Sequence, residues 1–326
     1  MSTSAEHVLV LTNSSDVTSD YLCSRFEVEG VRFSRFDTDK DCSTATFLYQ
    51  SGSPSLEWST GSLRAKQVTS VVLRRPKPVE VHRDGDVYSE RHTAGEWSEA
   101  IEGFLAHIEE GLWVNHPARN GEASHKIEQL SRSERYGLKI PRTLVTNSVQ
   151  EAEGFVLSEK NGVIVKPLSS GFIERARPEQ DTVIYTSQFT VENHALLKEV
   201  KYCPVLFQEM VPKVIDVRVT MLDGIIVATG MRALERDGRQ RLDVRRNNMS
   251  DVEYFPLEPP HDVSTAARSL VRSYGLRFAA LDFGVTESGD WFFFEINPNG
   301  QWAWLDIWGK ADIASVFVKQ LKGACP

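Results

Sequence analysis

The chain has 326 residues, 41% of them hydrophobic and 25% charged, a composition ordinary for a globular protein of two or three units. Its 37 lysine and arginine residues against 45 aspartate and glutamate residues give a net charge of −8, which offers a nucleic-acid partner no electrostatic support. No apolar run approaches the roughly 20 residues that span a bilayer. Residues 1–7 lack the core of a signal peptide and the four cysteines form no CxxC pair, so we expect a cytoplasmic protein without a zinc site.

The first third of the chain alternates predicted strands and helices. Residues 7–12 form a short apolar run typical of a buried strand, and Asp16 can cap a helix that ends at Gly30. Residues 31–37 alternate apolar and polar side chains as a strand does, and a third strand, 71–75, stops before two prolines. With a helix over 92–110, these elements predict an open α/β domain over residues 1–117.

A second unit is expected over residues 118–204. It begins with a helix over 121–136, which Gly137 ends. A strand (143–146), a helix capped by Asn147 and a strand (163–166) follow, before a loop rich in serine and glycine. A strand near 183–190 and a helix near 191–200 complete this central subdomain.

The third unit, residues 205–326, is predicted to be mostly antiparallel. Two strands, 216–222 and 225–234, flank Asp223-Gly224, a strong hairpin signal. A helix near 263–274 precedes two strands, 279–286 and 291–297, and a helix over 311–321 ends the chain. The expected fold class is therefore α/β with α+β features, in three units.

An acidic hairpin over residues 280–302 carries the most informative pattern. A turn over 287–290 sets residue 286 opposite 291 and therefore Asp282 opposite Glu295, with Cβ atoms about 5 Å apart. Asn297 follows two residues later, on the same strand face as Glu295. These oxygen ligands suit Mg²⁺, which binds substrate phosphates alongside one or two carboxylates. A solvent-facing hairpin edge is the alternative, but three phenylalanines at 292–294 indicate a largely buried strand.

Candidate cations for a phosphate precede this hairpin. Lys126 lies in a predicted helix. Lys166 ends a strand before Ser169, Ser170 and Gly171, small residues whose N–H groups can close over an anion. Taken singly, each lysine could equally be a solvated surface residue. Neither GxxxxGK[ST] nor GxGxxG occurs, which excludes a P-loop protein and a standard dinucleotide binder.

Three further segments are candidates for binding. Residues 207–212 are apolar with one acid, and they can line an adenine pocket or simply form a strand. Asp216 and Arg218 lie on one strand face, where they form either an ion pair or a phosphate contact through Arg218. The basic loop 241–246 suits a phosphate or a carboxylate, although most such runs are solvated.

Taken in order, these motifs resemble the ATP-grasp superfamily over about residues 114–321. The finer resemblance is to the maturases of graspetides, microviridin-like peptides that are cross-linked through side-chain esters or amides. It rests on VNHPARN (114–120), LKIPRTLVTN (138–147), VKPLSSG (165–171), DVRVT (216–220) and EINPNGQW (295–302), with LRRPKP (73–78) in the first unit.

The resemblance implies an ATP-grasp fold of three subdomains and roles for numbered residues. Arg218 and Arg245 would stabilise the acyl phosphate, although this chain has Val244 where the family's Asp-Trp-Arg segment carries tryptophan. Leader recognition would use the middle unit, here Glu192 and Asn193 in a segment that could equally be an ordinary amphipathic helix. The candidate ATP-binding residues are Lys126, Lys166, Ser169, Ser170, Gly171, Gln208, Glu209, Met210, Val211 and Asp216, and the candidate magnesium ligands are Asp282, Glu295 and Asn297, with Glu295 bridging two ions.

The implied activity is ATP-dependent activation of Asp or Glu side chains in a ribosomal precursor peptide, followed by ester or amide formation with Thr, Ser or Lys. The implied partner is that peptide, with its leader and core; we expect a homodimer and neither nucleic acid nor membrane. One alternative is a RimK-like ligase that adds an amino acid to a free carboxylate, and a kinase would share the superfamily. Another is a non-catalytic ATP-binding regulator, against which retention of all three metal positions argues.

Overall fold

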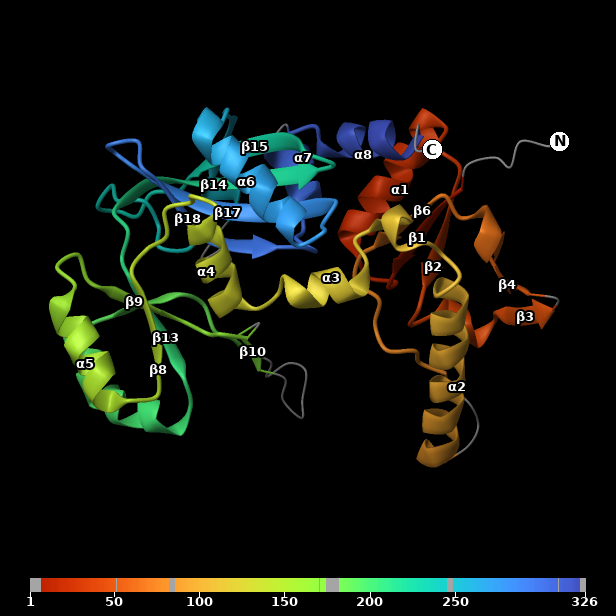
Figure 1. Ribbon diagram of the computed structural model, residues 1–326, viewed down its shortest axis with the longest axis horizontal. Helices are drawn as coiled ribbons and strands as arrows, with labels where there is room; N and C mark the ends of the chain where they lie inside the picture. Colours follow the sequence, from red (N-terminus) through yellow and green to blue (C-terminus); the bar gives the residue numbers. More distant parts are fainter. Residues whose placement is uncertain are drawn as a thin grey trace.

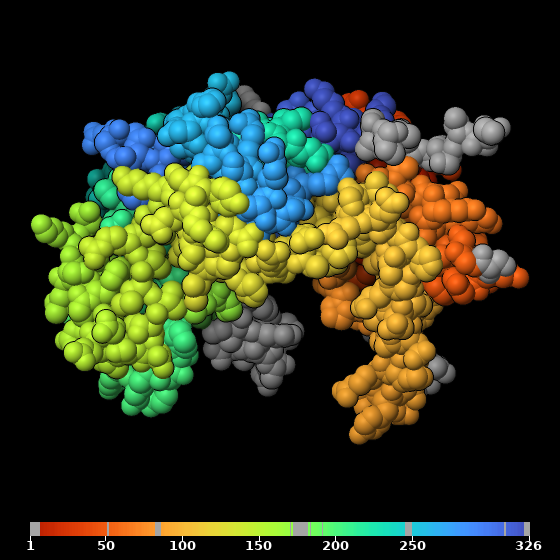
Figure 2. Space-filling model, viewed as in Figure 1, coloured from red at the N-terminus to blue at the C-terminus, as the bar shows by residue number. Residues whose placement is uncertain are grey.

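The computed structural model describes residues 7–50, 52–81, 86–169, 171–173, 182–244, 249–309 and 311–322. The N-terminal unit and the middle unit lie at opposite ends of the molecule, and the C-terminal unit contacts both (Figure 1). Figure 2 shows a recess on one face, between the middle unit and the long helix of the N-terminal unit. The predicted α/β architecture in three units is confirmed. No helix within the described ranges has the length and apolarity to cross a membrane.

The described residues form the following elements. The helices are α1 (Val17–Glu29), α2 (Val87–Leu105), α3 (Pro117–Glu122), α4 (Lys126–Arg135), α5 (Val149–Ser158), α6 (His261–Ser273), α7 (Ala303–Gly309), α8 (Ile313–Lys322) and the 3-10 helix η5 (Val191–Tyr202). The first strands are β1 (Val8–Thr12), β2 (Phe33–Asp37), β3 (Thr46–Gln50), β4 (Ser53–Trp58), β5 (Gly61–Arg64), β6 (Ser70–Leu73), β7 (Trp113–Val114), β8 (Thr143–Thr146) and β9 (Val163–Lys166). The later strands are β10 (Phe172–Ile173), β11 (Thr182–Val183), β12 (Ser187–Phe189), β13 (Val205–Glu209), β14 (Lys213–Leu222), β15 (Ile225–Arg232), β16 (Glu253–Pro256), β17 (Phe278–Thr286) and β18 (Trp291–Asn297).

The N-terminal unit is built on a parallel sheet of order β2-β1-β6-β7. Strand β1 is apolar from Val8 to Leu11 because both faces of its sheet are covered. On one face Val8 and Val10 join a core with α1, α7 and α8. On the other, Leu9 and Leu11 join a core with α2 and the antiparallel sheet β3-β4-β5. Asp16 caps α1 as predicted, since its carboxylate accepts an amide hydrogen bond of the first turn.

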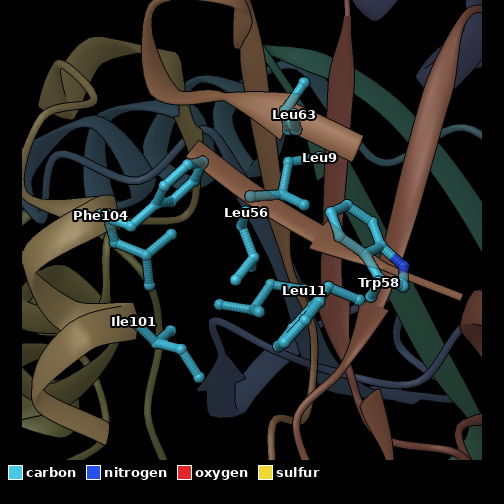
Figure 3. Close-up of a pocket in the computed structure, with 9 residues that line it drawn as sticks. Leu9, Leu11, Leu56, Trp58, Leu63, Ile101 and Phe104 are labelled. Atoms are coloured by element: carbon cyan, nitrogen blue, oxygen red, sulfur yellow. The ribbon is translucent and has the colours of Figure 1, made fainter. Parts of the chain in front are cut away.

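A small cavity lies inside the second of these cores (Figure 3). Leu9 and Leu11 point into it from β1, and Ile101 and Phe104 from α2. Its lining is apolar and its volume is about 10 Å³. A gap of this size and polarity is a packing defect and no ligand site.

The middle unit is a four-stranded antiparallel sheet of order β12-β9-β13-β8, with α5 and η5 against one face. Phe207 of β13 packs there with Ala152 of α5 and Leu197 of η5. Because β13 pairs with both β8 and β9, this sheet continues past residue 204. We therefore propose that the middle unit ends after Glu209, later than the sequence led us to expect.

The C-terminal unit is a five-stranded antiparallel sheet of order β16-β15-β14-β17-β18. The predicted Asp223-Gly224 turn joins β14 to β15, and both residues have positive φ. Helix α6 covers one face of the sheet through apolar residues such as Leu270. At one end of the sheet, Leu222 and Phe278 enter the core that β1 shares with α8. The first and third units therefore share one hydrophobic core.

Two local predictions need correction, and one sheet was missed. The helix expected over 121–136 is two helices, because α3 ends at Glu122 and α4 begins at Lys126. Helix α5 is capped by Ser148, whose hydroxyl accepts the Glu151 N–H at 3.4 Å, and not by Asn147. The antiparallel sheet β3-β4-β5 was not predicted, because the outward side of β3 is largely exposed and lacks a clear apolar alternation.

Candidate functional site

A cavity of about 1080 Å³ opens between the middle and C-terminal units. All three units contribute to its wall: Lys166 comes from β9, Asp282 from β17, and Arg75 from the segment after β6. Its lining is both polar and apolar, and its volume suits a nucleotide together with part of a second ligand. The residues singled out from the sequence that line it are Lys126, Lys166, Ser169, Glu209, Val211, Asp216, Arg218, Asp282, Glu295 and Asn297.

The acidic hairpin, β17 and β18, lies in this wall with one correction to its register. Near the turn, residue 285 pairs with Trp291, where the sequence predicted residue 286. A β-bulge then leaves Phe294 as an extra residue, and beyond it Asp282 pairs with Glu295 as predicted. Asn297 follows on the same face, opposite Ala280.

Arg218 extends this arrangement onto a third strand. It pairs with Asp282 across β14 and β17, and its Nε lies 2.6 Å from the Asp282 Oδ1. Both side chains are largely buried, at 14% and 24% exposure. Arg218, Asp282 and Glu295 therefore form one row across β14, β17 and β18, in which Arg218 stands beside Asp282 and Glu295 is next in the row on the cavity wall.

The oxygen donors of the hairpin are suited to a hard cation. Within the described ranges, no three His, Cys, Asp or Glu side chains gather into a metal-binding group. The hairpin instead offers the carboxylates of Asp282 and Glu295 and the amide oxygen of Asn297, and that oxygen accepts the Asn299 N–H at 3.0 Å. Mg²⁺ sites typically combine a small number of protein oxygen ligands with space for a polyanion such as a substrate phosphate.

Lys166 also lines the cavity, near these carboxylates. Its ammonium donates a 2.9 Å hydrogen bond to Gln208 Oε1 and lies 4.9 Å from the ring centre of Phe294. Burial lowers the pKa of Lys166 to about 8, and the negative charge of Glu295 opposes that shift. Gln208 is itself buried and donates to Thr143 Oγ1 at 2.9 Å, so it fixes the lysine in place.

Lys126, the first residue of α4, reaches the loop that follows Lys166. Its ammonium donates hydrogen bonds to the backbone carbonyls of Pro167 at 2.6 Å and Ser169 at 3.2 Å. Two lysines from different elements, α4 and β9, therefore meet on the same loop in the cavity wall that includes the acidic hairpin. An anion of several charges fits between them and a metal on the hairpin.

Comparison with known proteins identifies the fold. Neither a family model nor a curated protein sequence matches the chain. Among solved structures, the macrocyclase MdnC from Microcystis aeruginosa MRC, bound with precursor peptide MdnA, superposes with a TM-score of 0.81 at 26% identity, over 98% of this chain and 100% of that one. The macrocyclase MdnB from the same organism gives 0.74 at 26% identity, over 97% and 99%. A RiPP-associated ATP-grasp ligase from Chryseobacterium gregarium, in complex with ADP and a leader and core peptide, gives 0.79 at 21% identity, over 98% of each chain.

The chain has an ATP-grasp fold. Its likeness to the macrocyclases extends over nearly the whole length of both chains, including the N-terminal unit. The resemblance to the graspetide maturases agrees with these neighbours, of which two are macrocyclases and one is a RiPP-associated ATP-grasp ligase.

The segment expected to hold adenine lies only partly on the cavity wall. Glu209 and Val211 line the cavity. Gln208 is buried and accepts a hydrogen bond from Lys166, so it reaches the site through that lysine. The Met210 N–H is bonded to the Gly162 carbonyl at 2.9 Å.

Asp216 does not pair with Arg218, so the ion pair considered from the sequence is wrong. Its carboxylate accepts hydrogen bonds from Lys213 Nζ and from Gln240 Nε2, the latter at 2.8 Å. Burial raises the pKa of Asp216, against the effect of Lys213. Sequence reasoning missed Lys213, which lines the cavity as a third lysine and lies only three residues before Asp216.

Several remaining candidates lie away from the cavity wall or outside the residues that the structure describes. Ser170 and Arg245 lie outside the described residues. Gly171 is buried, and a Cβ there would lie 2.7 Å from the Ile184 carbonyl oxygen, so the loop requires glycine. Glu192 is exposed at the start of η5, where the Asn193 side chain accepts the Thr190 N–H at 3.0 Å.

Two buried amides that hold the acidic strands were also missed. Gln129 of α4 bonds both backbone groups of Ile296, donating to its carbonyl at 2.9 Å and accepting its N–H at 3.2 Å. Asn115 accepts the Phe278 N–H at 2.8 Å and donates to the Pro298 carbonyl at 2.8 Å. A signal was present for Asn115, because it lies within VNHPARN, whereas nothing distinguishes Gln129 in its helix.

Proposed function

We propose that the protein is an ATP- and magnesium-dependent peptide macrocyclase. It activates Asp or Glu side chains of a ribosomal precursor peptide as acyl phosphates and joins them to Thr or Ser hydroxyls as esters, or to Lys amines as amides. The row of Arg218, Asp282 and Glu295, which lines one large cavity together with Lys126 and Lys166, carries this conclusion. Support comes from the macrocyclase MdnC, which is bound with its precursor peptide and shares this fold along its whole length.

Three lysines provide the ATP side of the site. Lys126, Lys166 and Lys213 line the same cavity, and they would hold the phosphates against the acidic hairpin. The nucleotide base would lie beside Glu209 and Val211, at the end of β13. The Chryseobacterium ligase, which is in complex with ADP, supports a nucleotide in this fold.

Asp282, Glu295 and Asn297 would hold magnesium. Two carboxylates at adjacent ladder positions repel each other, and Arg218 stands beside only one of them. A bound cation between them would neutralise the pair and the phosphate oxygens, and this charge neutralisation is the chemistry that magnesium supplies. Arg218 would remain beside Asp282, positioned toward the transferred phosphoryl group.

The residues of the chain would work mainly by binding and orientation. A peptide carboxylate oxygen attacks the γ-phosphorus of ATP, the bond to the bridging oxygen of ADP breaks, and an acyl phosphate forms. The lysines and Arg218 stabilise the negative charge on the phosphoryl oxygens. The hydroxyl or amine of the peptide then attacks the acyl carbon, loses its proton, and expels phosphate. One water is lost from the peptide for each cross-link.

The peptide would enter beside the apolar part of the cavity wall. That part includes Met231, Val244, Trp304 and Trp308. Trp308 is 57% exposed, so its ring is available to a ligand. Glu192 and Asn193, in the middle unit, are proposed to contact the leader. We further propose that the enzyme is a cytoplasmic homodimer, and sedimentation analysis tests its oligomeric state.

The test uses the short open reading frame beside the gene, translated as a peptide. Incubation with the protein, ATP and Mg²⁺ should reduce the peptide mass by one water per cross-link, with ADP and phosphate released. Intact ATP with no loss of mass, under conditions in which the protein is folded, would overturn the proposal. Free amino acids offered as acceptors distinguish the RimK-like alternative, which would increase the mass of the peptide. A non-catalytic regulator would bind ATP without hydrolysing it.

The metal assignment has its own test in Glu295→Gln. The amide keeps the shape of the side chain but removes the charge that faces Asp282, so Mg²⁺ binding should weaken. We expect peptide turnover to fall at least about 1000-fold, as for removal of a group that acts in the transition state. Lys139→Gln is the control, since it removes an exposed ion pair with Asp290 near the hairpin turn. An active Glu295→Gln enzyme would remove Glu295 from the metal site.

A further inference from the structure

The turn that follows Asn297 is held by the N-terminal unit. Strand β18 is the last strand of its sheet, so no strand supports its outer side at Asn297. Lys139 bridges to that side at Phe292, and Gln129 bonds it at Ile296. From Asn297 onward the chain turns through residues 298–301 toward the N-terminal sheet. The position of a candidate metal ligand therefore depends on what restrains this turn.

Arg74, at the end of β6, provides much of that restraint. Its side chain is 2% exposed. One guanidinium nitrogen donates to the Gly300 carbonyl at 3.2 Å, and the other donates to Gln301 Oε1 at 3.1 Å. The Asn299 amide in turn donates to the Arg74 carbonyl. One residue of the N-terminal sheet thus contacts three consecutive residues of the turn.

Asp16 and Gln301 close this contact into a ring. The Asp16 side chain is fully buried, and its carboxylate lies 3.7 Å from Nε of Arg74. It also accepts a hydrogen bond from Gln301 Nε2 at 3.3 Å, while Thr18 donates to Gln301 Oε1. Arg74, Asp16 and Gln301 are called the brace below. They come from β6, the N-cap of α1 and the turn, so the brace connects segments that are distant in the sequence.

The charged groups of the brace are not the most stabilising choice for a contact that is only structural. Burying an arginine and an aspartate removes both charges from water, and apolar residues of similar volume are often at least as stabilising at such positions. What the charges add is geometric: a guanidinium offers two parallel donors in a fixed fork. That fork is used on the turn itself, at the Gly300 carbonyl and the Gln301 side chain.

The turn also contacts Arg218. A Cβ on Gly300 would lie 3.2 Å from Nη1 of Arg218 and 2.7 Å from Cβ of Ala280, so the backbone there packs directly against the row of charged residues. Displacement of the turn would therefore move Asn297 on one side and release Arg218 on the other. Both are residues of the candidate site.

We propose that Arg74, Asp16 and Gln301 are positioning residues that set the metal-binding geometry of the hairpin from the N-terminal unit. Arg74 and Asp16 lie behind the cavity wall, which Gln301 reaches, and the three act through the turn on Asn297 and Arg218. This role rests on the proposed function, because it takes Asn297 as a magnesium ligand. Residues that orient metal ligands in this way typically contribute 10–100-fold to metal affinity.

Arg74→Lys is the decisive variant, because it keeps the charge beside Asp16 and removes the fork. We expect the Mg²⁺ concentration for half-maximal ADP binding, measured by calorimetry, to rise roughly 10-fold or more. ADP binding without Mg²⁺ should stay within about twofold of the wild type, since the lysines are untouched. Arg35→Lys is the matched control: Arg35 also pairs with aspartates of the N-terminal unit, Asp20 and Asp37, but does not contact the turn.

A polarity swap provides a second measurement if Arg74→Lys does not fold. The single substitutions Asp16→Asn and Gln301→Glu each weaken one contact of the brace. Made together, they exchange the hydrogen-bond donor and acceptor between positions 16 and 301, and the net charge of the brace is unchanged. Asparagine also remains a good helix cap at position 16. We expect each single variant to lose Mg²⁺ affinity and the double variant to recover most of that loss.

Several results would overturn the brace. They are unchanged Mg²⁺ dependence in Arg74→Lys, an equal loss in Arg35→Lys, an equal loss of metal-free ADP binding, or additive losses in the double variant. If ADP binding by the wild-type protein does not depend on Mg²⁺, the proposed metal site is wrong, and so is the role of the brace. If the wild-type protein requires Mg²⁺ and Arg74→Lys binds ADP and Mg²⁺ equally well, only the role of the brace is wrong.

Discussion

At the scale of single residues, Lys166 combines burial with a charge that phosphate binding requires. Burial lowers its pKa to about 8, and the attraction of Glu295 offsets this shift only in part. Below that pH the folded protein carries the buried charge at a cost. As the pH rises through 8 toward the ordinary lysine value, the folded state releases a proton that the unfolded chain still holds, so this contribution to stability increases. Phosphate binding has the opposite dependence, because it uses the ammonium form.

Nucleotide affinity should therefore fall as the pH rises above about 8. In calorimetry between about pH 7 and pH 9.5, ATP binding should also become coupled to proton uptake, since the phosphates restore the charge of Lys166. Lys166→Arg keeps its charge at every such pH and should remove most of this dependence. A wild-type affinity that stays flat across the range would contradict this account of Lys166.

The candidate site could be predicted from sequence where one strand or one loop carries the pattern. Asp282, Glu295 and Asn297 lie on two consecutive strands, so ladder periodicity was enough to bring them together. Gln301 and Arg74 are 227 residues apart, and no local period records their contact. The partner of Asp216 was misassigned for a related reason, because Lys213 reaches it across a register shift at the start of β14.

At the scale of elements, the acidic hairpin illustrates how a correct pair can follow from an incorrect register. Counting from an assumed four-residue turn places residue 286 opposite 291, but the ladder starts one position earlier. The bulge at Phe294 inserts one residue and restores the pairing at Asp282. Neither the turn length nor the bulge can be read from hydrophobic alternation, since both leave the apolar pattern of β18 unchanged.

The close approach of the turn to β17 leads to a prediction for Gly300→Ala. The added methyl would lie 2.7 Å from Cβ of Ala280, so either the turn or Arg218 must move. Misplacement of reacting groups by about 1 Å can cost roughly 100-fold in rate, and we expect a loss of that order in peptide turnover with the fold retained. Gly103→Ala is the matched control, because nothing lies within 4 Å of a Cβ there. Full activity of Gly300→Ala would show that the turn has room to adjust.

At the scale of the whole molecule, the N-terminal unit is joined to the C-terminal sheet by a buried amide. Asn115 accepts the N–H groups of Arg277 and Phe278 at 2.9 and 2.8 Å, and donates to the carbonyls of Phe278 and Pro298. The sequence predicted three units and most of their elements. It did not predict how they dock, because docking is decided by single buried polar groups and by shared cores that leave no periodic signal.

Asn115→Asp should destabilise the protein through this junction. The substitution keeps the shape but places a carboxylate against the carbonyls of Phe278 and Pro298, which lose their donor. We expect the free energy of unfolding to fall by about 2–3 kcal/mol or more, as for other unsatisfied buried groups. Denaturant unfolding measures it, with Asn147→Asp, at an exposed position, as the control. If the two variants unfold at the same denaturant concentration, Asn115 does not stabilise the junction.

The core that β1 shares with α7 and α8 has a consequence for synthesis of the protein on the ribosome. Helix α1 follows β1 directly, but it covers only part of that face of the sheet until Phe317 and Leu321 have been translated. Val8 and Val10 therefore stay partly exposed while the intervening chain is made, a time in which nascent chains are open to chaperones and aggregation. The contact between Arg74 and Gln301 forms equally late. The nucleotide lysines are therefore made before the acidic hairpin, and the site becomes complete only after α8 has left the tunnel and joined this core.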